Sequence, residues 1–129
     1  MKFLLDTHVF LWYLTGAKAL APQTRELLRD PLHQVFVSPV SLWEAWMKHQ
    51  LGKLSLPDEP GAYLSRQRAR HGLASLALDE ASVLHLMNLP DLHRDPFDRL
   101  LICQAIHHGL ILMTVDAQIQ AYPVETLAP

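Results

Sequence analysis

The chain is 129 residues long, with half of its residues hydrophobic and 19% charged, which is typical of one folded domain and argues against disorder. Its net charge of −2 excludes the strongly basic field that dominates non-specific binding of nucleic acids. A polyanionic substrate would therefore need a local patch or bound cations. The single cysteine, Cys103, excludes an internal disulfide and a cysteine-rich zinc site, which fits a reducing cytoplasm.

The first residues superficially resemble a signal peptide, because Lys2 precedes an apolar stretch and small residues follow it. Asp6 and His8 interrupt that stretch, which argues against export. No apolar run approaches the roughly 20 residues that span a bilayer. We therefore expect a cytoplasmic protein.

Short apolar runs alternate with helical patterns along the chain, which predicts βαβ units and a mainly parallel sheet. Strands are expected at 2–6, 34–38, 73–78, 110–114 and 124–127. Helices are expected at 7–14, 22–29, 39–52, 62–71, 79–88 and 96–109, with a short one after Asp116. Proline at the start of a segment and glycine just after its end set several of these limits.

Four acidic residues are expected at the carboxyl edge of this sheet, where ligands bind in open α/β folds. Asp6 ends the first strand, and Asp116 follows the strand at 110–114. Glu44 lies in the first two turns of the helix that leaves the second strand. Asp98 begins a helix that should run antiparallel to the next strand, so that its start lies beside Asp116.

Such a cluster of carboxylates requires compensation, because two unit charges about 4 Å apart repel by about 4 kcal/mol at an effective dielectric of 20. Oxygen ligands without thiolates favour Mg²⁺ or Mn²⁺ over zinc. These ions support phosphoryl chemistry by activating water and stabilising the leaving oxygen. Thr7 and Thr114, each close to an acid in the sequence, are placed to hydrogen-bond a ligand, water or phosphate.

Each acid also has a purely structural interpretation. Asp6 and Asp116 could cap the helices that follow them, and Asp98 could complement a helix dipole. Glu44 has the capping-box spacing with Ser41. Capping alone does not predict that all four converge on one edge.

Other residues are assigned structural roles first. Asp95 should be the N-cap before Pro96 and only secondarily a support for the site. The adjacent His107 and His108 should favour a helix C-terminus rather than share one ion. The tryptophans should lie in the core or in a subunit interface, Cys103 should be buried, and the basic run at 66–71 should be a solvated helix face or, alternatively, a phosphate contact.

Taken together, four segments resemble a PIN-domain ribonuclease, and in particular the VapC-type toxins of type II toxin–antitoxin pairs. They are Leu4-Leu5-Asp6-Thr7-His8, Ser38-Pro39-Val40-Ser41-Leu42-Trp43-Glu44, His93-Arg94-Asp95-Pro96-Phe97-Asp98-Arg99 and Leu112-Met113-Thr114-Val115-Asp116. The resemblance covers essentially the whole chain in order. It implies a PIN-like α/β/α sandwich with a central, mainly parallel sheet of four to five strands, in a single nuclease domain at 1–129.

The resemblance also implies a function and its partners. Asp6, Glu44, Asp98 and Asp116 would bind Mg²⁺ or Mn²⁺ and catalyse endonucleolytic cleavage of RNA by metal-activated water. Arg99 would orient a neighbouring carboxylate. A cognate antitoxin would neutralise the enzyme, and the chain would form a homodimer. The apolar run at 9–14 independently favours the dimer, because one short helix cannot bury it all in its own core.

Three alternatives remain open. A receiver-like signalling domain would require adjacent acids after the first strand and a late lysine, but Thr7 and His8 follow Asp6 and no lysine follows Lys53. A haloacid-dehalogenase-like phosphatase would require a second acid where His8 stands. A catalytically silent PIN-fold binding domain is opposed by the intact acids.

Overall fold

The computed structural model describes all 129 residues. Its strands are β1 (Lys2–Leu5), β2 (Gln34–Val37), β3 (Ala74–Ser75), β4 (Ile111–Met113) and β5 (Thr126–Leu127). Its helices are α1 (Thr7–Thr15), α2 (Pro22–Arg29), α3 (Pro39–Gln50), α4 (Pro60–Arg70), α5 (Glu80–Leu84), the 3₁₀ helix η1 (His85–Asn88), α6 (Pro96–His108) and α7 (Ala117–Gln120). No helix is both long enough and apolar enough to cross a membrane.

The strands form one five-stranded sheet in the order β3-β2-β1-β4-β5, and every neighbouring pair is parallel. Successive side chains of a strand point to opposite faces, so the central strand β1 contributes to two cores. Phe3 and Leu5 pack into one apolar cluster and Leu4 into the other. A parallel sheet must be covered on both faces, and the apolar sequence of β1 meets that need.

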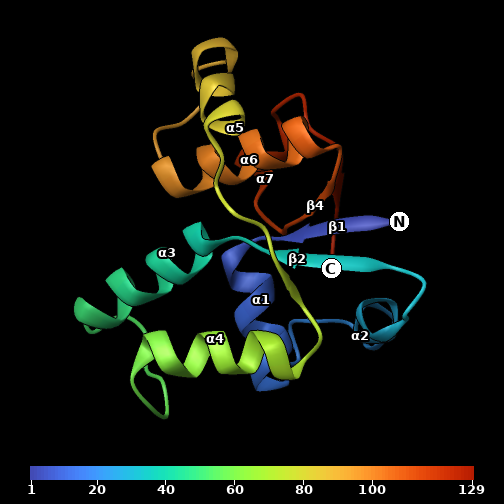
Figure 1. Cartoon of the computed structure of the whole chain (residues 1–129), viewed down its shortest axis with the longest axis vertical. Helices are drawn as coiled ribbons and strands as arrows, with labels where there is room; N and C mark the ends of the chain where they lie inside the picture. Colours follow the sequence, from blue (N-terminus) through green and yellow to red (C-terminus); the bar gives the residue numbers. More distant parts are fainter.

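Helices cover both faces of the sheet (Figure 1). Buried residues of α1, α2 and α4 join the cluster that contains Phe3, and those of α6 and α7 join the cluster that contains Leu4. Helix α3 contributes to both, through Ala45 and Val40 respectively. The α/β/α sandwich and the mainly parallel sheet expected from the sequence are therefore confirmed.

The carboxyl ends of the strands lie along one edge, where the following helices begin. Leu5 pairs with Met113, Met113 with Leu127 and Val37 with Ser75. Leu4 pairs with Phe36, one residue before the ends of β1 and β2, so all five strands end in register. Asp6 directly follows β1 and caps α1, and Ser38 directly follows β2 and caps α3. Asp116 follows β4 after a short turn and caps α7. This edge therefore carries helix N-termini and the side chains that cap them.

Some expected limits were wrong. The fourth helix begins at Pro60 rather than at 62, because Glu59 accepts hydrogen bonds from the backbone of Gly61 and Ala62 and Pro60 occupies the first helical position. The strand expected at 73–78 shortens to the two exposed residues of β3 at the sheet edge. The helix expected at 79–88 divides into α5 and η1.

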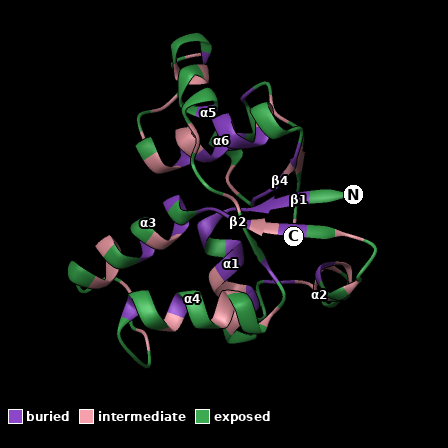
Figure 2. Cartoon of the chain, in the orientation of Figure 1, coloured by how far each residue is buried: buried purple, intermediate pink, exposed green.

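The burial of side chains in α6 and α3 depends on which helices pack against them. Residues 101–105 of α6 are all buried, because α5 and η1 cover the side of α6 that faces away from the sheet (Figure 2). Trp43 and Trp46 of α3 are 50% and 45% exposed, so these two tryptophans lie outside the core, and of the two expected placements only a subunit interface stays a prediction for them. Cys103 is buried, as expected, and burial raises the pKa of its thiol.

Candidate active site

Asp6 lies at the centre of the candidate site, at the end of the central strand. Its Oδ1 accepts a hydrogen bond of 2.7 Å from the backbone N–H of Thr7, and its Oδ2 accepts one of 2.8 Å from the hydroxyl of Thr114. The residue is only 3% exposed. Burial raises the pKa of its carboxyl, although these two hydrogen bonds oppose the shift. Asp6 is thus both a helix cap and a buried, fixed acid.

Glu44 enters the site from α3 and is held by two groups. Its Oε1 accepts a hydrogen bond of 2.7 Å from the hydroxyl of Thr7, and its Oε2 lies 2.9 Å from Nζ of Lys48. The residue is 4% exposed. Ser38 caps α3, so Glu44 does not belong to a capping box with Ser41. Its role in the fold is therefore not that of a cap.

Thr7 and Thr114 were expected to bond a ligand, water or phosphate, but each donates its hydroxyl to a carboxylate of the site. Each therefore fixes the direction of an acid. Lys48 was not anticipated, although its position four residues after Glu44 is the usual spacing of an ion pair on a helix.

Asp98 reaches the site from the first turn of α6. Asp95 caps this helix, as expected, by accepting hydrogen bonds from the backbone N–H groups of Phe97 and Asp98 at 2.9 and 3.2 Å. Asp98 is 7% exposed, and its Oδ2 lies 3.2 Å from Nε2 of His93. Burial raises the pKa of Asp98 to about 7, against the hydrogen bond from His93, and the charges of Asp6, Asp95 and Glu44 add to the rise.

His93 is the main residue of the site that sequence reasoning missed. Its Nδ1 lies 2.8 Å from the hydroxyl of Tyr122, which also accepts hydrogen bonds from the backbone N–H of His93 at 3.1 Å and from Arg99 at 2.9 Å. His93 stands in the quoted segment that contains Asp98, but it lies in a loop whose path the sequence pattern does not define. Tyr122 gave no signal.

Arg99 was expected to orient a neighbouring carboxylate. Its guanidinium donates to the carbonyl of Pro90 at 2.9 Å and to Tyr122, and the carboxylate nearest to it, 3.9 Å away, belongs to the exposed Asp91. Arg99 is therefore connected to Asp98 only through Tyr122 and His93. It fixes the loop that carries His93.

Asp116 completes the set at the start of α7. Its Oδ1 accepts a hydrogen bond of 2.8 Å from the backbone of Gln118, and its own N–H donates to the hydroxyl of Thr114 at 3.0 Å. The same hydroxyl donates to Asp6, so Thr114 links the two acids. Asp116 is more exposed than the other three acids.

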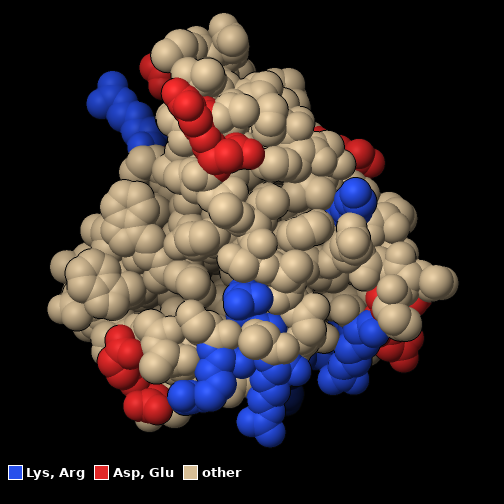
Figure 3. Space-filling model, in the orientation of Figure 1, with Lys and Arg blue, Asp and Glu red and all other residues tan.

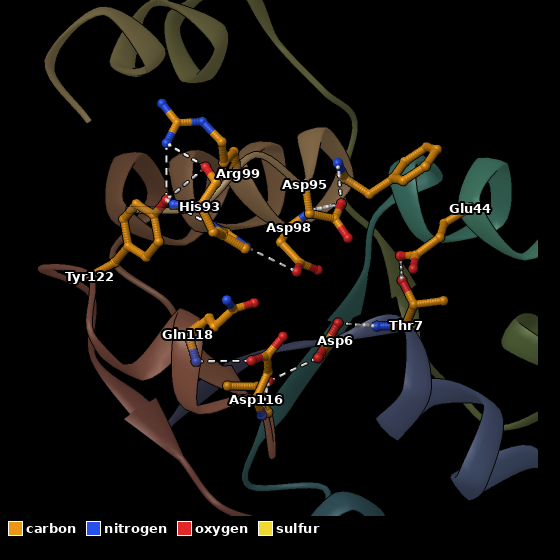
Figure 4. Close-up of polar contacts among 12 residues, drawn as sticks. Asp6, Thr7, Glu44, His93, Asp95, Asp98, Arg99, Asp116, Gln118 and Tyr122 are labelled. Carbon is orange, nitrogen blue, oxygen red and sulfur yellow. Dashed lines mark hydrogen bonds and ion pairs between the residues drawn. The ribbon is translucent and has the colours of Figure 1, made fainter. Parts of the chain in front are cut away.

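The elements bring these acids around a common space. In Figure 4 the carboxylates of Asp6, Asp98 and Asp116 turn toward one another, and Glu44 lies beside them on α3. Lys48 and His93 are the basic groups in direct contact with the set. Carboxylate oxygens at the end of a parallel sheet can hold a hard divalent cation, which would offset the burial and, beside it, the neighbouring negative charges that raise the pKa of Asp98.

A tighter group of metal-ligand side chains lies elsewhere. The ligand atoms of Asp79, His107 and His108 all lie within 4.8 Å of one another. The expectation that His107 and His108 could not face one ion was therefore wrong, because a nitrogen of each lies within this distance of the other and of Asp79.

A parallel sheet with acids at its carboxyl edge defines a class of protein, and comparison of the sequence with family models identifies that class. The family model of the PIN domain matches residues 3–125, and this chain therefore belongs to the PIN domain family.

One named protein is similar to this chain in sequence, and several solved structures are similar to it in fold. Ribonuclease VapC16 of Mycobacterium tuberculosis (strain ATCC 25618 / H37Rv) is 30% identical over 63 residues, a match that spans 49% of this chain and 45% of that protein. The chain is similar in structure to VapBC2 of Rickettsia felis bound to a DNA fragment from its promoter, with a TM-score of 0.75, 16% identity and 98% of each chain covered. It is similar to DNA-bound VapBC of Salmonella typhimurium, with a TM-score of 0.70, 17% identity and coverage of 98% of this chain and 97% of the other.

Proposed function

We propose that this chain is a divalent-metal-dependent endoribonuclease and the toxin of a type II toxin–antitoxin pair. The observation that carries the proposal is the convergence of Asp6, Glu44, Asp98 and Asp116 on the carboxyl edge of the sheet, with three of them buried. Buried carboxylates that oppose one another weaken the fold unless a cation binds. One nuclease domain would span residues 1–129.

The donor set fits Mg²⁺ or Mn²⁺, because all four ligands offer carboxylate oxygen and none offers sulfur. When bound, such an ion supplies an activated water and charge stabilisation for cleavage of a phosphodiester. The protein supplies position: Thr7 directs Glu44, Thr114 directs Asp6, and His93 directs Asp98. A fixed set of acids reduces the reorganisation that cation binding would otherwise need.

RNA would reach the pocket past a basic surface on α4. Lys and Arg side chains gather on the lower part of the face seen in Figure 3, over this helix. Arg66 and Arg70 are exposed, whereas Arg68 is half-buried and donates to the carbonyl of Leu73. The alternative stated from the sequence, a phosphate contact, suits Arg70 best, because Arg66 pairs with Asp58 at 3.3 Å and Arg68 bonds the backbone. Such a local patch compensates for a net charge of −2.

An antitoxin would act by covering the acidic pocket. A guanidinium from the partner suits this site, because its planar fork binds carboxylates bidentately. The exposed Trp43 and Trp46, on the helix that carries Glu44, offer apolar surface for the rest of a docking segment. The VapBC complexes to which this chain is structurally similar support the choice of an antitoxin as partner. Removal of the candidate arginines from the antitoxin should weaken inhibition, and full inhibition without them would contradict the inserted guanidinium.

The test of the proposed function is cleavage of total RNA by the purified chain, followed by mapping of the cut ends. We expect specific cuts with Mn²⁺ or Mg²⁺ and none after EDTA, because the acids alone cannot stabilise the developing charge. An Asp98→Asn variant that folds normally serves as the matched control. Specific cleavage that survives EDTA would contradict the metal mechanism. Absence of cleavage at any metal concentration would favour the silent binding domain.

A further inference from the structure

A second cluster of metal-ligand side chains lies at the opposite end of α6 from Asp98. His107 and His108 are the last residues of this helix, which ends where Gly109 adopts a positive φ of 66°. About ten residues of helix at about 1.5 Å each separate them from Asp98, or about 15 Å. The cluster is therefore distinct from the acidic pocket.

The chain brings a carboxylate to these histidines from another element. Asp79 caps α5 by accepting a hydrogen bond of 2.9 Å on Oδ1 from the backbone of Ser82. This contact leaves Oδ2 free to face α6, where it lies 3.0 Å from Nε2 of His108. The cap thus fixes the direction of the carboxylate, and one ligand atom each from Asp79, His107 and His108 lie within 4.8 Å of one another.

His85 adds a fourth side chain at the margin. Its Nε2 lies 3.1 Å from Nδ1 of His107. The rings of His107 and His108 stand at 86° to each other with their centroids 4.9 Å apart. His85 is thus placed to orient the ring of His107.

These groups have the chemistry of a borderline transition metal rather than that of Mg²⁺. Two imidazoles and one carboxylate suit Zn²⁺, whose bonds of about 2.0–2.1 Å in tetrahedral geometry place neighbouring ligand atoms about 3.3 Å apart. The 3.0 Å between Asp79 and His108 is already close to that spacing. Because His107 and His108 are exposed at a helix end, small rotations of their side chains can bring the third ligand in.

We propose that Asp79, His107 and His108 form a binding site for Zn²⁺, with His85 as a positioning residue for His107. Three protein ligands leave a coordination position for water. Bound Zn²⁺ joins the start of α5 to the end of α6. The segment of α5 and η1 packs mainly on α6, and the metal fastens it there. This proposal does not depend on the proposed nuclease activity.

The experiment is titration of the full chain with Zn²⁺ in a background of millimolar Mg²⁺, which competes for sites made of carboxylate oxygen alone. Calorimetry gives the stoichiometry, the absorption spectrum of the Co²⁺ form reports nitrogen and oxygen ligands, and thermal unfolding gives the shift in Tm. We expect one Zn²⁺ per chain and a rise in Tm of about 5 °C. The double variant His107→Gln/His108→Gln should lose at least about tenfold in affinity and most of the shift in Tm.

Two further variants separate ligation from folding. Asp79→Asn keeps an N-cap for α5 but removes the charged ligand, so it should fold like the wild type and bind Zn²⁺ at least about tenfold more weakly. His71→Gln, at the C-cap of α4, removes a histidine outside the cluster and should leave the affinity unchanged. Equal affinity in the wild type and the double variant, or an equal loss in His71→Gln, would overturn the proposal and indicate adventitious binding by surface histidines.

Discussion

Asp98 is a buried acid at the start of α6, and its pKa lies near neutral pH. Burial raises its pKa from 3.8 to about 7, so the folded chain binds this proton more tightly than the unfolded chain does. Its contribution to the free energy of unfolding is therefore complete below pH 3.8 and is lost as the pH rises through about 7. Ionised Asp98 is thus a cost to the metal-free fold at the pH where a cation would bind best.

The first prediction concerns Asp98→Asn, which keeps the shape of the side chain but cannot ionise. In EDTA the variant should melt at a higher temperature than the wild type at about pH 8, and this advantage should shrink toward about pH 5, where Asp98 is protonated. Thermal unfolding at both pH values measures the difference. In the same variant RNA cleavage should fall about tenfold or more. A stability difference independent of pH would contradict the assigned cause.

The second prediction concerns His93, whose hydrogen bond lowers the pKa of Asp98. His93→Phe keeps a ring in the loop but removes the nitrogen that faces Asp98. The pKa of Asp98 should then rise, so the acid limb of the cleavage profile should move to higher pH and the affinity for Mn²⁺ should fall about tenfold.

Tyr122→Phe provides the matched control for His93. It removes the hydroxyl that holds His93 but leaves the contact between His93 and Asp98 in place, so its effect on the pH profile should be smaller. If His93→Phe leaves the profile unmoved, His93 has a structural role only.

At the scale of the element, the N-terminus of α6 is stabilised by Asp95, the residue that immediately precedes the helix. Asp95 accepts hydrogen bonds from two backbone N–H groups, one of which belongs to Asp98. The same cap therefore stabilises the helix and fixes the backbone that presents an acid to the pocket.

The third prediction is that Asp95→Ala lowers the free energy of unfolding by about 1 kcal/mol, because the N-terminal N–H groups lose their acceptor. Asp95→Asn should lose much less, since an Asn side chain caps nearly as well. Urea unfolding of both variants measures the difference. Equal destabilisation by Ala and Asn would show that the charge of Asp95, rather than its cap, stabilises the chain.

The limits of most elements could be predicted because local chemistry sets them. Pro96 and Gly109 bound α6, and Ser38 and Pro39 start α3, as the sequence indicated. The start of α4 could not be predicted as readily, since Glu59 lies between prolines in a segment that reads as a loop. The burial of α6 on its outer side depends on α5 and η1, which fold back onto it through a loop whose path the sequence pattern does not define.

The same distinction holds for the candidate site. The positions of Asp6, Glu44, Asp98 and Asp116 followed from strand ends and helix starts. Contacts that depend on loop paths did not follow, and His93 with Tyr122 is the main example. The expectation for His107 and His108 failed because helical periodicity gives the direction of a Cβ but not the rotation of an imidazole beyond it.

At the scale of the whole molecule, apolar surface remains exposed. Helix α1 buries Val9, Phe10 and Tyr13 but leaves Leu11, Trp12 and Leu14 only half-buried. Trp43 and Trp46 of α3 add to this surface. Patches of this kind usually mark contacts with another protein.

The fourth prediction is that the isolated chain forms a homodimer through the half-buried side of α1. Sedimentation at micromolar concentration should give twice the monomer mass of 14.6 kDa. A Trp12→Ala variant should shift the equilibrium toward monomer, and Trp46→Ala should do so less if that residue faces an antitoxin. A single 14.6 kDa species in the wild type would contradict the dimer.

The hydrogen bond between Asp6 and Thr114 joins residues 108 positions apart. Asp6 is synthesised near the start of translation, whereas its hydrogen-bond partner Thr114 is synthesised only after β4. Until then the central strand lacks one of its two neighbours, and the acid that ends it has no hydroxyl to hold it. A nascent chain therefore cannot assemble the pocket beside the messenger that encodes it. The strand order thus delays any chemistry at this edge until synthesis is nearly complete.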